Sequence, residues 1–244
     1  MALPTYGQKA KIDSLLKILP DLPPDEGKVN TLNYLALKLS ANNTSLASEL
    51  SEEAISLAQG LGFQQGLAKA YNARAVVKRM SGEYDGALED FILALDINQT
   101  LKDSVGIGQT LNGIGALYML TEDFENALDH FKQGFELRRA NADTSGMAVA
   151  LSNMGNASEK LGNLDEALGY HNQSIAYDLA KGNELSSSYS LHSMGLIFEK
   201  KGQLVKAEQN LRRALRLREA GMHDFGIAET CLALGKLLFK MEDF

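Results

Sequence analysis

Residues 106–131 read GIGQTLNGIGALYMLTEDFENALDHF, and residues 146–171 read GMAVALSNMGNASEKLGNLDEALGYH. The two stretches align without a gap, 40 positions apart, and each holds two runs of apolar residues at helical spacing. In the first stretch, one run extends from Leu111 to Leu117 and the next begins at Phe124. The pattern predicts two amphipathic helices in each block of 40 residues.

Small residues recur at fixed positions of the blocks. Alanine occupies the twenty-second position of every block that reaches it: Ala47, Ala87, Ala127, Ala167 and Ala207. Glycine occupies the tenth position in Gly115, Gly155, Gly195 and Gly235, where it costs roughly 1 kcal/mol relative to alanine in a helix. Both columns therefore predict places where two helices approach closely. Gly82, Gly162 and Gly202, with Glu122 and Asn42 standing in for glycine, mark the turn between the helices of a block.

These positions divide the chain into one N-terminal segment and a series of repeats. We expect an N-terminal helix and Pro-rich connector (1–25), a degenerate capping repeat (26–65), four repeats (66–105, 106–145, 146–185 and 186–225) and the first helix of a truncated sixth repeat (226–244). The N-terminal helix should cover residues 8–19 and end at Pro20. Because the last helix would lack its partner, we expect the chain to be part of a longer protein.

The repeat resembles the tetratricopeptide repeat family over residues 26–244. The residues that carry the resemblance are Leu191, Met194-Gly195, Phe198, Gly202, Ala207, Leu211 and Ala214, with their equivalents in the other blocks. The usual repeat has 34 residues, and we expect the additional ones here in the second helix and in a polar connector after it. The resemblance implies an all-α, right-handed α-α superhelix, a solenoid of about five helix-turn-helix repeats plus a half repeat. Similar 40-residue repeats occur in kinesin light chain, in GoLoco-motif G-protein regulators and in bacterial signalling proteins.

Composition and motifs argue against several classes of function. The net charge is −7, which disfavours a nucleic-acid or anionic-membrane surface, and no run of 18 apolar residues exists. The single cysteine, Cys231, rules out an internal disulfide and fits either a reducing compartment or a periplasmic protein without disulfides. We expect a cytoplasmic location, with the periplasm as the alternative if a signal peptide has been removed. The histidines lack metal-binding spacing, and Gly106-Ile-Gly108 lacks the rest of a phosphate-binding loop. We expect no cofactor, no metal and no catalytic residue, hence no enzyme.

The resemblance also implies a site. In this family the first helices line a concave groove, and the columns that contact ligands there are mostly polar in this chain. The expected peptide-binding residues are Lys69, Asn72, Arg79, Gln109, Asn112, Met119, Ser152, Asn156, Glu159, Tyr189, His192 and Glu199. The predicted function is a protein-interaction scaffold that binds a partner peptide or helix, as the sensory or coupling part of a larger signalling protein. The alternative is self-assembly, as a homodimer formed through the C-terminal half repeat.

Overall fold

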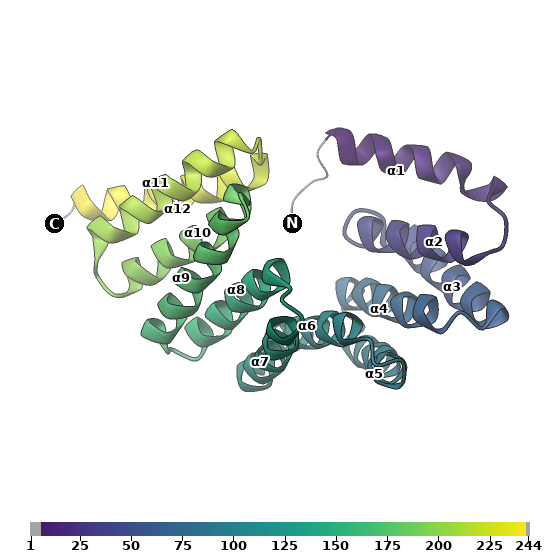
Figure 1. The fold of residues 1–244 in the computed structure, drawn as a ribbon. Helices are drawn as coiled ribbons and strands as arrows, with labels where there is room; N and C mark the ends of the chain where they lie inside the picture. The colour runs from purple at the N-terminus through teal and green to yellow at the C-terminus, as the bar shows by residue number, and fades with distance from the viewer. Residues whose placement is uncertain (1–5, 243–244) are drawn as a thin grey trace. The chain divides into compact units, whose positions relative to one another are not determined.

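The structure, a computed structural model, is all-α, as the sequence predicts, and describes residues 6–242 (Figure 1). The helices of its first half are α1 Tyr6–Ile18, α2 Glu26–Leu39, α3 Thr44–Leu61, α4 Gln64–Ser81, α5 Tyr84–Thr100 and α6 Ser104–Leu120. Those of the second half are α7 Phe124–Ala140, α8 Thr144–Lys160, α9 Leu164–Ala180, α10 Glu184–Lys200, α11 Leu204–Ala220 and α12 Asp224–Glu242. The predicted N-terminal helix is α1, which a 3-10 turn (Leu19–Asp21) containing Pro20 follows. The outermost residues of the predicted segments 1–25 and 226–244, namely 1–5 and 243–244, lie outside the described residues.

From α3 onward, successive helices begin 20 residues apart. One residue in each turn from α3 onward has a positive φ: Gly62, Gly82, Lys102, Glu122, Ala142, Gly162, Gly182, Gly202 and Met222. From α6 to α11 every helix has 17 residues, and three residues connect it to the next. The predicted extension of the second helix is confirmed, but the predicted longer connector after it was wrong, because this connector has three residues from α5 onward. The additional residues lengthen the helices, so both turns of a repeat are short.

The chain divides into two compact units. The N-terminal unit comprises α1–α6 and ends at Thr121, and the C-terminal unit comprises α7–α12 and begins at Glu122. In the N-terminal unit, α2 packs on α3 and α4 on α5, and α3 and α4 join these pairs. In the C-terminal unit, α8 packs on α9 and α10 on α11, while α7, α9 and α11 contact the helices that follow them. The boundary falls within residues 106–145, which the sequence predicts as one repeat.

Both units have cores of aliphatic side chains between successive helices. In the N-terminal unit, Leu32 and Leu35 of α2 lie in a buried cluster with residues of α3 and α4. In the C-terminal unit, Leu191 of α10 lies between α9 and α11, and Leu211 of α11 packs with Leu237 of α12. Within each unit, the helices between the first and the last therefore bury one face against the helix before them and another against the helix after them.

The predicted small-residue columns lie at close helix contacts. All five alanines of the twenty-second column have no exposed surface. A methyl group added at Gly155 would approach the ring of His171 to 2.7 Å, and one added at Gly195 would approach Leu211 to 2.6 Å. Gly235 is different, because nothing lies within 4 Å of an added methyl group there. The prediction of tight packing is thus confirmed at Gly155 and Gly195 and wrong at Gly235.

The turn geometry gives a first test. Gly162 has φ +84, so Gly162→Ala should lower the free energy of unfolding by about 1–2 kcal/mol, because an L side chain is strained in this region. Gly169→Ala is the matched control, since Gly169 lies within α9 and an added methyl group there meets nothing within 4 Å. It should raise the free energy of unfolding by about 0.5–1 kcal/mol. Chemical denaturation measures both, and effects of the same sign would contradict the assigned turn.

Candidate functional site

The predicted peptide-binding residues fall into two groups, one in each unit. On the N-terminal unit, α4 carries Lys69, Asn72 and Arg79, and α6 carries Gln109, Asn112 and Met119. On the C-terminal unit, α8 carries Ser152, Asn156 and Glu159, and α10 carries Tyr189, His192 and Glu199. All of these side chains are at least partly exposed except His192, which is buried.

Within each unit, polar side chains join neighbouring first helices, α4 to α6 and α8 to α10. In the N-terminal unit, Asn72 donates from Nδ2 to Thr110 Oγ1 on α6, at 2.9 Å. In the C-terminal unit, the Ser190 hydroxyl donates to Ser152 Oγ at 3.3 Å, and the Ser193 hydroxyl donates to Asn156 Oδ1 at 3.3 Å. Several of the groups that were predicted to meet a ligand therefore also hold neighbouring helices together.

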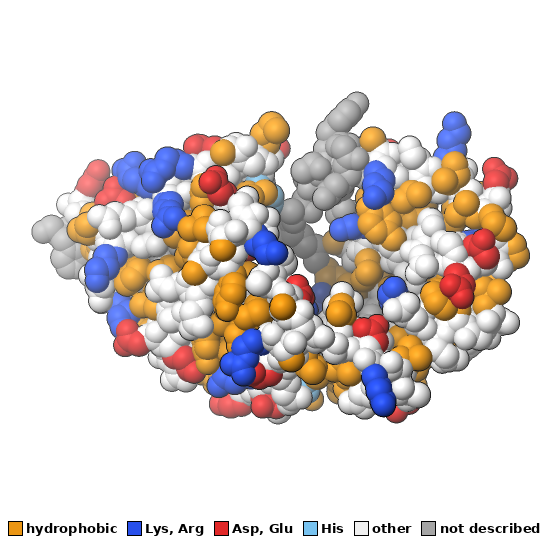
Figure 2. Space-filling model, in the orientation of Figure 1, with side chains coloured by type: hydrophobic (Ala, Val, Ile, Leu, Met, Phe, Trp, Pro, Cys, Tyr) orange, Lys and Arg blue, Asp and Glu red, His pale blue; other side chains and the backbone are white. Residues whose placement is uncertain are grey.

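The acidic residues of this face are paired as well. Lys200 Nζ lies 2.6 Å from Glu159 Oε1, and Lys240 Nζ lies 3.6 Å from Glu199 Oε1. Figure 2 shows acidic and basic side chains mixed over the visible face of each unit, with Lys and Arg side chains gathered along α11. The Glu159 and Glu199 charges are thus partly neutralised by lysines of the same unit.

A pocket of about 330 Å³ opens on this face of the C-terminal unit. Three predicted residues line it, Ser152, Asn156 and Tyr189. Val149 of α8, which also lies in a ligand-contacting column, lines it as well. The other lining residues were not predicted: Ala148 and Asn153 of α8, Ser174 and Asp178 of α9, and Ser186 of α10. The ligand-contacting columns that the family resemblance implies lie on the first helices only, so they do not include α9. One signal was present, because Asp178 belongs to a column that is polar in four successive blocks: Asn98, Arg138, Asp178 and Arg218.

Asp178 is the most unusual group in the pocket. The residue is only 7% exposed, and its side chain makes no hydrogen bond or ion pair with any residue of the described range 6–242. Burial raises the pKa of its carboxyl group above the ordinary value. In the N-terminal unit, by contrast, a buried carboxylate is paired with basic side chains. Asp90 accepts a hydrogen bond from Arg74 Nη2 at 2.7 Å and lies 2.9 Å from Lys78 Nζ. Asp178 therefore presents an unpaired acceptor to the pocket.

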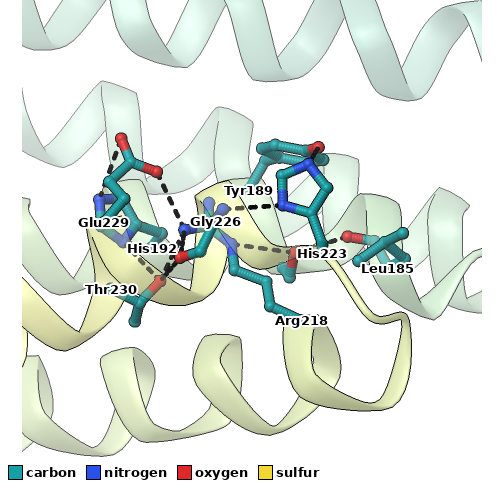
Figure 3. Close-up of polar contacts among 9 residues, drawn as sticks. Leu185, Tyr189, His192, Arg218, His223, Gly226, Glu229 and Thr230 are labelled. Carbon is teal, nitrogen blue, oxygen red and sulfur yellow. Dashed lines mark hydrogen bonds and ion pairs between the residues drawn. The ribbon is translucent and has the colours of Figure 1, made fainter. Parts of the chain in front are cut away.

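A second polar cluster surrounds Arg218 of α11, the equivalent of Asp178 one block later (Figure 3). Arg218 is 1% exposed, and Nη1 donates to Gly226 O at 2.8 Å, Thr230 Oγ1 at 2.6 Å and Glu229 Oε2 at 3.0 Å. The guanidinium also lies 5.2 Å from the ring centroid of Tyr189. This cation is held by hydrogen bonds and a carboxylate on one side and by an aromatic ring on another.

His192, one of the predicted ligand contacts, belongs to this cluster. Its Nδ1 lies 3.3 Å from Thr230 Oγ1, and its Nε2 lies 3.9 Å from Glu229 Oε1. Burial lowers the pKa of His192, Glu229 opposes this shift, and Arg218 adds to it. A depressed histidine pKa favours the neutral ring at pH 7, so His192 acts as a buried hydrogen-bonding group within the cluster.

Over residues 6–242, no three His, Cys, Asp or Glu side chains come together as a candidate metal site. None of the described helices is long and apolar enough to cross a membrane.

Comparison with known families decides the class of protein. The sequence profile described as tetratricopeptide repeat matches residues 66–140 and 146–220, which together make up more than half of the chain. The chain belongs to the tetratricopeptide repeat family. The matched ranges start at Gly66 and Gly146, where the sequence analysis placed block openings. This family fold is a protein-interaction scaffold that is typically non-catalytic. No curated protein matches this chain in sequence.

Solved structures share the tetratricopeptide solenoid fold and confirm the predicted fold class. BtubC (BKLC) from P. vanneervenii is similar with a TM-score of 0.71 and 21% identity, over 87% of this chain and 91% of that one. A Rap protein complexed with competence and sporulation factor has a TM-score of 0.78 and 17% identity, over 99% and 71%. A signal transduction ATPase with numerous domains and a tetratricopeptide repeat sensor, from Pyrococcus horikoshii, has a TM-score of 0.70 and 13% identity, over 96% and 41%. At these identities the likeness shows the fold alone.

The charges around His192 give a second test. Arg218→Met removes a positive charge and should raise the pKa of His192, whereas Glu229→Gln removes a negative charge and should lower it further. A pH titration of the His192 ring followed by NMR measures both. Glu208→Gln is the control, because Glu208 pairs with Arg212 on α11 outside the cluster. Shifts of the same sign in the first two variants would contradict the arrangement.

Proposed function

We propose that this chain is a protein-interaction scaffold whose C-terminal unit binds an extended segment or a helix of a partner protein across α8 and α10. The observation that carries the proposal is the pocket on this face, where Ser152, Asn156 and Tyr189 meet. Amide and hydroxyl groups can bond to a peptide main chain, and an exposed tyrosine offers a rigid aromatic contact. The Asn156 Nδ2 group makes no hydrogen bond within the described chain, so it is free to donate.

The setting that we propose is the sensory or coupling part of a larger signalling protein. Two similar structures support this, the Rap protein complexed with competence and sporulation factor and the ATPase with a tetratricopeptide repeat sensor. In such a protein the repeat array recognises a partner, and no catalytic step falls to the array itself. The location that we propose is the cytoplasm.

The test is selection of peptides from a random 12-residue library on the immobilised 244-residue chain. The double variant Asn156→Ala with Tyr189→Ala should weaken the selected peptides by about tenfold or more, because it removes a donor and an aromatic contact. Asn172→Ala, an exposed asparagine of α9 outside the pocket, is the matched control and should bind like the wild type. Equal affinities of the double variant and the wild type, measured by calorimetry, would place binding elsewhere and contradict the proposal.

Self-assembly through α12 is a second candidate function, which the apolar side chains on α12 favour. Leu232 is 62% exposed and Phe239 is 69% exposed, and their spacing of seven residues places both on one face of the helix. Large apolar groups at this spacing are suited to pairing with a second copy of the chain.

Light scattering tests this second candidate. The wild type should form dimers at tens of micromolar concentration, and Leu232→Glu with Phe239→Glu should give monomers. Circular dichroism checks that the variant keeps its helices. A wild-type chain that stays monomeric over this range contradicts self-assembly.

A further inference from the structure

The pocket beside Asp178 has an equivalent one block later, and there the side chain of Arg218 fills it. A shift of 40 residues carries Asp178 onto Arg218 and Ser186 onto Gly226. Arg218 Nη1 donates to Gly226 O at 2.8 Å, so the guanidinium lies against the position equivalent to Ser186. The same location is therefore filled by an arginine at Arg218 and lined by an aspartate at Asp178.

The other polar copies of this column also cover the glycine that opens the following block. Arg138 contacts Gly146 so closely that an added methyl group would collide with its guanidinium. A methyl group at Gly106 would come within 2.5 Å of Asn98 Oδ1. Aspartate is shorter than arginine, so Asp178 leaves open the space that Arg138 and Arg218 occupy in their blocks. This replacement accounts for the pocket.

The buried carboxylate of Asp178 makes the pocket suited to a cation. A buried carboxylate without a partner is unfavourable, and the chain avoids this at Asp90 with two basic side chains. Asp178 is 7% exposed and lacks such partners among the described residues. Its surroundings in the pocket are hydroxyl and amide groups, Ser152, Ser186 and Asn156, whose oxygens accept hydrogen bonds.

The mouth of the pocket suits a planar cation. Tyr189 and Val149 line it and are both exposed, so a side chain that enters from solvent passes an aromatic ring and an aliphatic group. The ring centroid of Tyr189 lies 5.2 Å from Cζ of Arg218, which occupies the equivalent location one block later. A volume of about 330 Å³ is at the lower end for ligand pockets, which fits one side chain.

We propose that this pocket binds the guanidinium group of an arginine side chain supplied by the partner peptide, with Asp178 as its counter-ion. The ligand's arginine takes the place that Arg218 fills in the next block. Arginine is favoured over lysine because its planar fork can donate to both carboxylate oxygens and stack on an aromatic ring. The inference rests on the proposed function, and it names the side chain by which the partner is recognised.

The direct test uses a small probe and the full chain. N-acetyl-arginine N-methylamide, titrated into ¹⁵N-labelled protein, should shift the side-chain amide signals of Asn153 and Asn156, and the uncharged citrulline analogue should bind about tenfold or more weakly. Asp178→Asn should weaken the arginine probe by about tenfold or more. Asp165→Asn is the matched control, because Asp165 lies on the same helix, pairs with Lys201 and is outside the pocket. Equal binding of the two probes, or no effect of Asp178→Asn, overturns the inference.

The pH dependence of probe binding gives an independent readout. Because burial raises the pKa of Asp178, its carboxylate is lost at a higher pH than that of an exposed aspartate. Arginine binding should weaken as the pH falls through that pKa, and the residual binding of Asp178→Asn should not change in this range. An identical pH profile in the wild type and the variant contradicts the role of Asp178 as counter-ion.

A second variant tests the inference by filling the pocket with a side chain of the protein itself. Asp178→Arg combined with Ser186→Gly copies the Arg218 and Gly226 pair into the earlier block. The variant should keep its helices, unfold at a temperature no lower than that of the wild type, and lose the arginine probe, because its own guanidinium fills the pocket. Undiminished binding of the probe by this variant overturns the inference.

The selected peptides separate this inference from the proposed function. Enrichment of arginine, lost on screening Asp178→Asn, supports both. Peptides that bind across α8 and α10 with no preference for arginine overturn the inference and leave the scaffold function in place. Binding of the arginine probe without capture of any peptide supports the subsite and contradicts the scaffold function.

Discussion

The short turn of two or three residues with one left-handed residue is the constraint on which the rest of this structure depends. It recurs every 20 residues from Gly62 to Met222, and it reverses the chain after each helix from α3 to α11. Because the turns are short and α6 to α11 are equally long, equivalent residues return to equivalent places after two helices. The fixed alanines at helix contacts and the polar pairs between first helices both follow from this regular spacing. The left-handed geometry is held even at Lys102, Glu122, Ala142 and Met222, where the side chain disfavours it.

A strict repeat makes each exception informative. The column of Asn98, Arg138, Asp178 and Arg218 lies where a second helix meets the start of the next first helix. Three of its members cover a glycine with their own side chains. Asp178 faces Ser186 instead, and a pocket with an unpaired carboxylate results. The other buried carboxylate described above, Asp90, is paired with two basic side chains. The lack of a partner at Asp178 is therefore specific to that position.

Membership of the tetratricopeptide repeat family and the pocket together support a scaffold that recognises a partner through the C-terminal unit. The Arg218 cluster shows that this unit can hold a guanidinium group among a carbonyl, a hydroxyl, a carboxylate and an aromatic ring. A ligand that places an arginine beside Asp178 would use the same chemistry from outside the chain. His192, by contrast, is buried within that cluster, where its Nδ1 lies 3.3 Å from Thr230 Oγ1.

The sequence by itself determined the period, the all-α class, the family and the columns that pack, because helix periodicity and the need for small residues at crossings act within a few dozen residues. The family resemblance also predicted Ser152, Asn156 and Tyr189 as peptide-binding residues, and these three line one pocket. Only the tertiary structure decided that Ser190 bonds to Ser152, that His192 is buried and that Asp178 lacks a partner. These facts depend on which side chains meet between helices that are 20 to 40 residues apart in the chain. That meeting is set by helix packing, and the spacing of a single block does not reveal it.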